Sequence, residues 1–311
     1  MSNTKRKYIF GPVPSRRLGS SLGVDLVPYK TCTLDCIYCQ IGKTTEKTSR
    51  RFEYVPTKEV VRELKEVIDE GTKPDVITMS GSGEPTLHLG IGEIIRTAKD
   101  ICDIPVVVLT NATTLHLPEV REALMPADIV APSLDAGTKD MFEIINRPAS
   151  GVSFEGLVEG LTLFAKDYKG KLLVEVLVLA GMNSTESEMI AIRDILSGIE
   201  LDEVQLNTVT RPPAEEFAES VKREKLEELA LLFDPPATVI ADFKGKSLSS
   251  RPVGEDEILD SVSRRPMTAD DISQVTGMDR RVVGKVISEL VSRQKLVTSN
   301  QSGRIYYSVP R

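Results

Sequence analysis

Three of the four cysteines of this 311-residue chain lie close together, as Cys32, Cys36 and Cys39. Thiolates are soft ligands, so three of them favour a soft metal site. A structural zinc ion needs four ligands, and the only histidines, His88 and His116, lie far along the chain. A disulfide is disfavoured because three closely spaced cysteines do not pair off. An iron–sulfur cluster held by only three protein ligands would keep one iron open for another ligand.

The spacing Cys32-x3-Cys36-x2-Cys39, with Tyr38 directly before the third cysteine, resembles the signature of the radical S-adenosylmethionine (SAM) enzymes. In that family the cysteines hold a 4Fe-4S cluster, and SAM chelates the fourth iron through its amino and carboxylate groups. The resemblance implies that the reduced cluster passes an electron to the sulfonium, which yields methionine and a 5′-deoxyadenosyl radical. It therefore also implies two cofactors, the 4Fe-4S cluster and SAM, and a low-potential electron donor as a partner.

Three motifs further along the chain resemble the SAM-binding positions of this family. Gly81-Ser82-Gly83-Glu84 resembles its GGEP motif, with Ser82 in place of one glycine, and the segments 110–111 and 133–135 resemble its TN and SxD positions. Without the resemblance, such segments are often a tight turn or helix caps. The SAM contacts that the resemblance implies are Tyr38, Gly81, Gly83, Glu84, Asn111 and Ser133.

Two longer stretches, 11–28 and 205–215, resemble a subfamily grouped with the wyosine tRNA-modifying (imidazoguanosine synthase-like) radical SAM proteins, over about residues 8–245. Enzymes of that pathway bring extra N-terminal cysteines for a second cluster, whereas residues 1–31 contain none. We therefore carry over the radical chemistry, assign no catalytic side chain, and leave the substrate open between an RNA and a protein. Polar residues near the cysteines and near later strand ends are the substrate candidates: Arg16, Arg17, Asn183, Gln205, Asn207 and Arg211.

Strand-type apolar runs alternate with helical runs along the first 245 residues. The predicted strands are 23–27, 76–80, 105–110, 128–134, 171–180 and 203–209, with a further run at 237–243 left open. The pattern predicts a parallel sheet covered by helices, as a barrel or a doubly wound sheet. Because the motifs follow successive strand ends, as in barrel enzymes, we predict an α/β fold with a partial (β/α)6 TIM-like barrel over residues 1–245.

The last part of the chain predicts a separate small domain. Residues 246–254 lack apolar periodicity and are interpreted as a linker. Residues 255–311 predict three helices, the second capped by Thr268 and the third by Asp279, followed by a hairpin, which is the order of a winged helix-turn-helix domain. This domain could bind nucleic acid or dock on a protein. The nucleic-acid candidates on its third helix are Arg280, Arg281 and Lys285.

The composition is that of an ordinary globular chain, with a net charge of −7. Residues 1–250 hold 29 Lys/Arg against 38 Asp/Glu, whereas residues 251–311 hold 10 against 8, so the larger part is acidic and poorly suited to extensive nucleic-acid backbone binding. The longest apolar run, 172–182, is interrupted by Glu175 and is too short for a membrane span, so no membrane partner is expected. The polar first residues carry no secretion signal, and we expect a cytoplasmic protein.

These features together predict a radical SAM enzyme with an unidentified, macromolecular substrate. Two alternatives from other classes remain at this point. One is a transcription regulator in which the cluster reports redox state or SAM level to the winged helix. The other is an activase that makes a glycyl radical on a partner protein.

Overall fold

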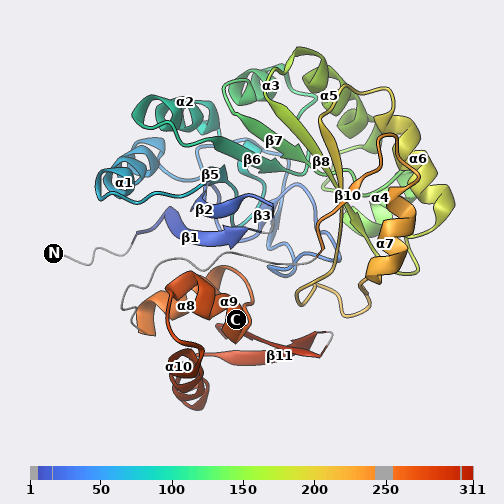
Figure 1. Cartoon of the computed structure of the whole chain (residues 1–311). Helices are drawn as coiled ribbons and strands as arrows, with labels where there is room; N and C mark the ends of the chain where they lie inside the picture. The colour runs from blue at the N-terminus through green and yellow to red at the C-terminus, as the bar shows by residue number, and fades with distance from the viewer. Residues whose placement is uncertain (1–5, 16, 242–254, 302, 311) are drawn as a thin grey trace.

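The computed structural model describes residues 6–15, 17–241, 255–301 and 303–310 (Figure 1). Its main feature is an 8-stranded sheet with the order β1-β2-β5-β6-β7-β8-β9-β10. Strand β1 runs antiparallel to β2, and the other pairings in this sheet are parallel. The strands are β1 (Ile9–Ser15), β2 (Gly19–Val24), β5 (Val76–Met79), β6 (Val106–Thr110), β7 (Ile129–Pro132), β8 (Lys171–Val178), β9 (Glu203–Thr208) and β10 (Thr238–Val239). The predicted α/β fold with a mostly parallel sheet is confirmed.

One strand of this sheet, β1, was missed by the sequence pattern. It contains Pro12 and Pro14, which have no backbone N–H and interrupt the alternation that marks a strand. Proline is confined to sheet edges and bulges. Strand β1 is an edge strand of this kind, and its register with β2 shifts between Phe10 and Val13. The run at 237–243, which the sequence left open, contributes the short strand β10 at the other edge.

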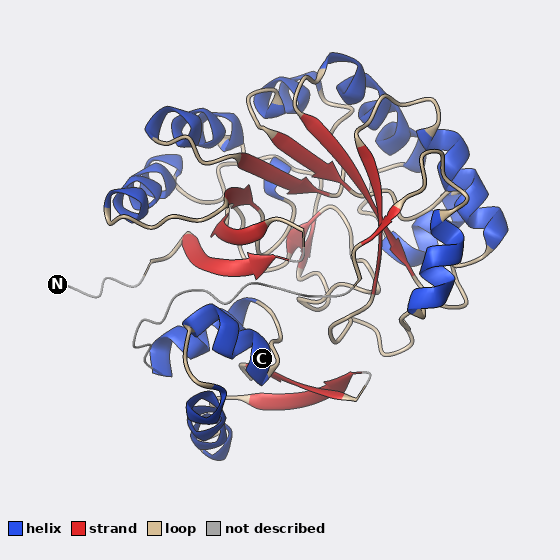
Figure 2. Ribbon diagram, viewed as in Figure 1, coloured by secondary structure: helices blue, strands red, loops and turns tan. Residues whose placement is uncertain are grey.

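Helices connect the parallel strands and lie around the outside of the sheet (Figure 2). They are α1 (Thr57–Asp69), the 3-10 helix η1 (Pro85–Leu87), α2 (Ile91–Ile101), α3 (Pro118–Leu124), α4 (Lys139–Asn146), α5 (Phe154–Asp167), α6 (Glu186–Leu196) and α7 (Arg223–Ala230). Their apolar faces pack on the sheet: Leu64 of α1, Ile94 of α2 and Val108 of β6 belong to one fully buried core. Since parallel strands point the same way, their carboxyl ends and the loops that follow meet at one edge of the sheet.

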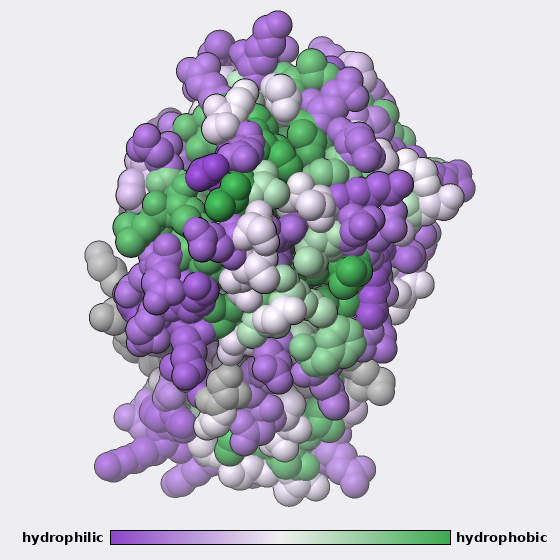
Figure 3. Space-filling model, turned by 90° about the vertical axis from the view of Figure 1, so that its right-hand side faces the viewer, coloured by the Kyte–Doolittle hydropathy of each residue, from purple (hydrophilic) through white to green (hydrophobic). Residues whose placement is uncertain are grey.

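The outward faces of the helices are polar. Ion pairs one helical turn apart, such as Arg62–Glu66 on α1 at 2.7 Å and Arg223–Glu227 on α7 at 2.8 Å, lie on these faces. Figure 3 shows hydrophilic side chains over much of one face of the molecule, with hydrophobic ones between them. In the part of the chain that the structure describes, no helix is long and apolar enough to cross a membrane.

Residues 255–310, which we call the C-terminal module, contain the predicted order of elements. Helices α8 (Glu255–Arg264), α9 (Ala269–Thr276) and α10 (Arg280–Ser292) precede the antiparallel pair β11 (Val297–Gln301) and β12 (Arg304–Ser308). Thr268 and Asp271 form a capping box at the start of α9, and Asp279 caps α10, as predicted. A core of its own, including Ile258, Ile272, Val283, Ile287 and Leu290, holds the module together.

The apolar residues of α10 differ in burial. Val283, Ile287 and Leu290 are buried, whereas Val282 is 46% exposed. The three buried residues are spaced by four and three positions, which keeps them on one helical face, and Val282 lies about 100° around the helix from Val283. Helix α10 therefore packs on the core of the module through one face.

The C-terminal module lies beside the β1 edge of the sheet (Figure 1). Helix α9 contacts β1, and Tyr306 Oη of β12 donates a 2.6 Å hydrogen bond to the carbonyl of Thr210 in the loop after β9. The linker predicted at 246–254 lies outside the described residues. The limits of the two predicted domains therefore stay predictions.

The capping box of α9 can be tested by Thr268→Ala. The substitution removes the hydroxyl that accepts from the Asp271 amide at 3.1 Å. Loss of an N-cap costs about 1 kcal/mol. Hydrogen–deuterium exchange should therefore be faster at the amides of α9, with little change in the strands of the large sheet. Ser288→Ala, an exposed position inside α10, is the matched control. Equal exchange in Thr268→Ala and the control would show that the cap contributes nothing.

Candidate functional site

The three cysteines lie in the loop that follows β2, at the carboxyl edge of the parallel sheet. Cys32 ends the two-residue strand β3 (Thr31–Cys32), which pairs with β4 (Glu46–Lys47). Backbone bonds hold the loop to the end of α4: the Asp35 amide donates to the Asn146 carbonyl at 2.9 Å, and the Ile37 amide to the Ile145 carbonyl at 3.0 Å. The loop is therefore fixed both to the sheet and to a helix that lies far along the sequence.

Each thiol of this loop accepts a hydrogen bond from a different side chain. Asn111 Nδ2 donates to Cys32 Sγ at 3.4 Å, Asn146 Nδ2 to Cys36 Sγ at 3.4 Å, and Lys30 Nζ to Cys39 Sγ at 3.1 Å. These donors come from the end of β6, the end of α4 and the loop itself. Neither Lys30 nor Asn146 was among the sequence candidates, although Lys30 stands two residues before Cys32.

Burial makes the thiols of Cys32 and Cys36 poor anions by themselves. It raises the pKa of Cys32 to about 12, with nearby Glu84 adding to the effect, and it raises the pKa of Cys36 as well. A bound metal supplies the positive charge that a buried thiolate needs. Within the described residues, no group of His, Cys, Asp and Glu side chains is arranged around a single ion. In a 4Fe-4S cluster each thiolate takes a different iron, and hydrogen bonds to the sulfurs tune the cluster. Three thiols that each face an N–H donor are compatible with such a group.

The glycine turn after β5 packs directly on the cysteine loop. A Cβ atom at Gly83 would lie 1.9 Å from the Thr31 carbonyl oxygen, so only glycine fits there. The Glu84 amide donates to the same oxygen at 3.1 Å, and the Lys30 amide donates to the Ser82 carbonyl at 2.5 Å. The motif predicted to bind SAM thus lies against the residue that precedes Cys32.

Glu84 is buried and fully hydrogen-bonded within the protein. Its carboxylate accepts from the amide and hydroxyl of Thr86 at 3.1 and 2.6 Å, from the Thr110 hydroxyl at 2.7 Å and from the Asn111 amide at 2.7 Å. Burial raises its pKa, and these hydrogen bonds oppose that rise. Glu84 therefore braces the turn after β5 against the end of β6, and its contact with a SAM amino group stays a prediction.

Tyr38 and the segment after β7 form a second braced group. Tyr38 Oη donates to Asp135 Oδ2, which also accepts from Asn146 Nδ2 at 2.9 Å, and the Leu177 amide donates to Asp135 Oδ1 at 3.0 Å. Burial raises the pKa of Tyr38 well above its usual value, and the charge of Asp135 adds to this, so the phenol remains a donor. Ser133 lies nearby at the end of β7, where its backbone bridges to Glu175.

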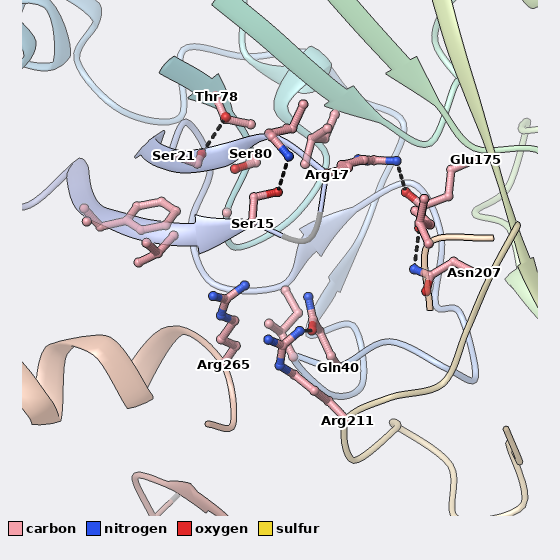
Figure 4. A pocket seen from close by; sticks show the side chains of 18 of the residues that line it. Ser15, Arg17, Ser21, Gln40, Thr78, Ser80, Glu175, Asn207, Arg211 and Arg265 are labelled. Atoms are coloured by element: carbon pink, nitrogen blue, oxygen red, sulfur yellow. Dashed lines mark hydrogen bonds and ion pairs between the residues drawn. The ribbon is translucent and has the colours of Figure 1, made fainter. Parts of the chain in front are cut away.

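A pocket of about 340 Å³ lies beside these motifs (Figure 4). Its wall includes Gln40, the residue after Cys39, and the glycines Gly81 and Gly83. Other walls come from β1, β2, β8 and the loop after β9. Two residues of the C-terminal module, Ser261 and Arg265, complete the lining. The pocket thus connects the cysteine loop, the glycine turn and the C-terminal module.

Several substrate candidates meet in one polar cluster at this pocket. Arg17 Nη1 lies 2.7 Å from Glu175 Oε2 and donates to Gln205 Oε1 at 2.8 Å, while Asn207 Nδ2 donates to Glu175 Oε1 at 2.7 Å. Glu175 was not predicted as a site residue. The sequence did contain a signal for Glu175, because a carboxylate within the apolar run 172–182 needs a partner or a function. Arg17, Glu175 and Asn207 line the pocket, and Gln205 supports Arg17 from the strand.

The other substrate candidates differ in where the structure places them. Arg211 lines the pocket and donates to Gln40 Oε1 at 3.1 Å. Asn183 does not face the pocket: it is fully buried, accepts from the Leu179 amide and donates to the carbonyls of Asp135 and Leu177, so we withdraw it as a substrate candidate. The Asn183 side chain fixes the loop after β8, because its amide oxygen and its amide nitrogen both bond backbone groups. Arg16 lies outside the described residues.

The nucleic-acid candidates lie on α10, which Figure 1 shows on the far side of the module from the sheet. Arg281 and Lys285 are exposed, and Arg280 Nε pairs with Asp270 Oδ1 at 2.5 Å. They do not take part in the pocket. Among the described side chains of the module, Arg265 lines the pocket. It follows α8, and no local sequence motif marks it.

Residues 26–196 match the family model described as Radical SAM superfamily. A UPF0026 protein of Methanocaldococcus jannaschii is 30% identical over 96% of this chain and 94% of its own length. A protein named GTPase Obg, from Brachyspira hyodysenteriae, is 36% identical over 99% of this chain, and this chain spans 46% of that longer relative. The solved structure of TYW1 with a lysine-pyruvate adduct bound shares the fold, with a TM-score of 0.54 and 17% identity over 70% of this chain and 74% of that chain.

The matched segment contains the features from which the site is built: the cysteine loop, the glycine turn after β5, and the ends of β6 and β7. It covers more than half of the chain. The chain is therefore a relative of the UPF0026 proteins and belongs to the radical SAM superfamily.

Proposed function

We propose that the protein is a radical SAM enzyme that cleaves SAM reductively at a 4Fe-4S cluster and directs the radical to an RNA or protein substrate. The observation that supports this most directly is the contact between the cysteine loop and the glycine turn, with the pocket beside both. Neither the transcription regulator nor the glycyl-radical activase is favoured by the family match or by the geometry.

The cluster would be held by Cys32, Cys36 and Cys39. When bound and reduced, it supplies the electron that splits the S–C5′ bond of SAM into methionine and the 5′-deoxyadenosyl radical. The chain's own residues hold the sulfurs in place: Asn111, Asn146 and Lys30 each direct an N–H group at one of them. Hydrogen bonds to the sulfurs help to set the reduction potential of such a cluster.

SAM would lie along the carboxyl ends of β5, β6 and β7. In this proposal the glycine turn, with Gly81, Gly83 and Glu84, binds the amino group, Tyr38 packs on the adenine, and Asn111 and Ser133 contact the remainder. Glu84 and Asp135 keep these groups in position, since both carboxylates are buried and satisfied by hydrogen bonds from neighbouring elements. A positioned and sheltered pocket keeps the reacting carbon aligned and away from water.

We further propose the finer architecture expected from the sequence. The open sheet and its helices would be a partial (β/α)6 barrel over residues 1–245, followed by a linker at 246–254 and a winged-helix domain at 255–311. The chain would belong to the wyosine-like group of radical SAM proteins, with one cluster. Reduction would require a low-potential electron donor, which is a separate partner.

The cluster ligands can be tested by Cys→Ala at positions 32, 36 and 39. After anaerobic reconstitution with iron and sulfide, each variant should bind at least about tenfold less iron and release no 5′-deoxyadenosine with SAM and dithionite. Cys102→Ala is the control, because Cys102 caps the end of α2 away from the loop. Iron content and nucleoside release equal to the unsubstituted protein in all three variants would reject the cluster and the proposed activity together.

The contact between the two loops can be tested by Gly83→Ala. A methyl group there would overlap the Thr31 carbonyl, so the cysteine loop must move, and overpacking of this kind costs about 1–3 kcal/mol. We expect a lower midpoint of thermal unfolding and incomplete iron loading. In the control Gly198→Ala, the nearest atom to the new methyl group is 3.8 Å away. Normal iron loading in Gly83→Ala would mean that the close approach has no role in forming the site.

The winged-helix proposal places Arg281 and Lys285 against RNA phosphates. In filter binding with a single RNA over a range of salt, Arg281→Glu with Lys285→Glu should weaken binding and lower the salt-dependence slope by about 2. Lys58→Glu with Lys65→Glu, two exposed lysines on α1, makes the same charge change elsewhere. Binding that falls equally in both double variants would exclude recognition by α10 and leave a protein as the substrate.

A further inference from the structure

We propose that Arg211 and Arg265 form an anion-binding subsite in the 340 Å³ pocket, with one arginine from each part of the chain, and that it holds a phosphate or carboxylate group of the substrate. The subsite is built jointly by the large sheet and the C-terminal module. The assignment of the anion to the substrate rests on the proposed function, whereas anion binding itself can be measured without a cluster.

One N–H donor of Arg211 has no hydrogen-bond acceptor among the described residues. Its residue is only 9% exposed, and it lines the pocket. Its Nη1 donates to Gln40 Oε1 at 3.1 Å, but its Nε, which is buried, has no hydrogen-bond partner among the described residues. A buried guanidinium donor without an acceptor is costly. An anion in the pocket would supply that acceptor.

Arg265 approaches the same space from the C-terminal module. It lines the pocket just after α8, and Figure 4 shows its guanidinium group directed into the cavity, on the side where Arg211 and Gln40 lie. Paired arginines suit phosphates and carboxylates because their planar donors match the oxygens of these anions in bidentate geometry.

Strand β12 ties both arginine-bearing segments together. Tyr306 Oη donates to the Thr210 carbonyl, next to Arg211, at 2.6 Å. The adjacent Tyr307 exchanges two backbone bonds with Met267, two residues after Arg265, at 2.8 and 3.0 Å. Neighbouring residues of one strand thus fix the loop of Arg211 and the loop of Arg265, so the separation of the two guanidinium groups is set by the docking of the module.

Arginines outnumber carboxylates in the described lining of the pocket. The charged lining residues among the described part of the chain are Arg17, Arg211, Arg265 and Glu175. Glu175 lies 2.7 Å from Arg17 and accepts a hydrogen bond from Asn207. Guanidinium groups therefore make up most of this charged lining, and they suit an anion.

The position of the subsite fits substrate binding. The same pocket borders Gly81 and Gly83, and it borders Gln40 next to Cys39. An anion held by Arg211 and Arg265 would anchor one end of the substrate, with the rest extending toward the glycine turn and the cysteine loop. Such anchoring by a remote group is how binding energy positions a reacting carbon.

The test uses the anaerobically reconstituted full-length protein and measures binding of inorganic phosphate and of succinate by equilibrium dialysis. One of the two anions should bind, and Arg265→Gln should weaken that binding at least about tenfold, because a charge-assisted hydrogen bond is lost. Arg293→Gln, an exposed arginine of the same module with no assigned binding role, should bind as the unsubstituted protein does. Phosphate binding alone would identify a phosphorylated group, and succinate binding alone a carboxylate.

Tyr306→Phe gives a second variant that leaves both arginines in place. It removes the 2.6 Å bond between the module and the loop of Arg211, so it should also weaken anion binding. Absence of binding by the unsubstituted protein, or equal binding by Arg265→Gln, would overturn the inference. Anion binding that SAM displaces, together with weaker SAM binding in Arg265→Gln, would assign the subsite to the SAM carboxylate and overturn the substrate assignment.

The proposed function has a separate readout in the same samples. Iron content and 5′-deoxyadenosine release by the unsubstituted protein report on the radical chemistry, whereas dialysis reports on the subsite. Phosphate or succinate binding without any nucleoside release would contradict the proposed function but leave the subsite intact. Nucleoside release without binding of either anion would support the proposed function and overturn the subsite.

Discussion

The carbonyl oxygen of Thr31 occupies the space that a side chain at position 83 would fill, and the rest of the site depends on this contact. It brings the loop that carries three thiols against the turn at the end of β5. The residues at the ends of β6 and β7 lie next to this turn, because the loops that follow parallel strands lie at the same edge of the sheet. A bulkier residue at position 83 would push the cysteine loop away from this turn.

Two buried carboxylates, Glu84 and Asp135, and the half-buried Glu175 hold the elements of this edge together. Glu84 joins the turn after β5 to the end of β6, Asp135 joins Tyr38 to β8, and Glu175 joins β8 to Arg17 and β9. A buried carboxylate is tolerated only when several donors satisfy it, and a fully satisfied network fixes the elements that supply those donors. The loops of the site are therefore held in place by contacts within the protein itself.

The C-terminal module completes the pocket from outside the sheet. Its third helix carries the exposed basic residues that marked it as a nucleic-acid candidate, yet its contact with the site is made by Arg265 after α8 and by Tyr306 in β12. Two surfaces of one small module thus face different ways. One carries exposed basic side chains on α10, and the other forms part of the pocket wall.

The sequence by itself determined the features that arise within a few consecutive residues. The cysteine spacing, the apolar strands β5 to β9, and the caps at Thr268 and Asp279 depend on near neighbours in the chain, and each could be predicted, whereas the strand predicted at 23–27 is β2 at Gly19–Val24. Strand β1 could not, because Pro12 and Pro14 erase the local pattern and only pairing with β2 makes it a strand. The tertiary structure alone decided that Asn183 fixes a loop, that Glu175 pairs with Arg17, and that Arg265 and Arg211 line the same pocket, since each of these arrangements depends on how distant segments pack.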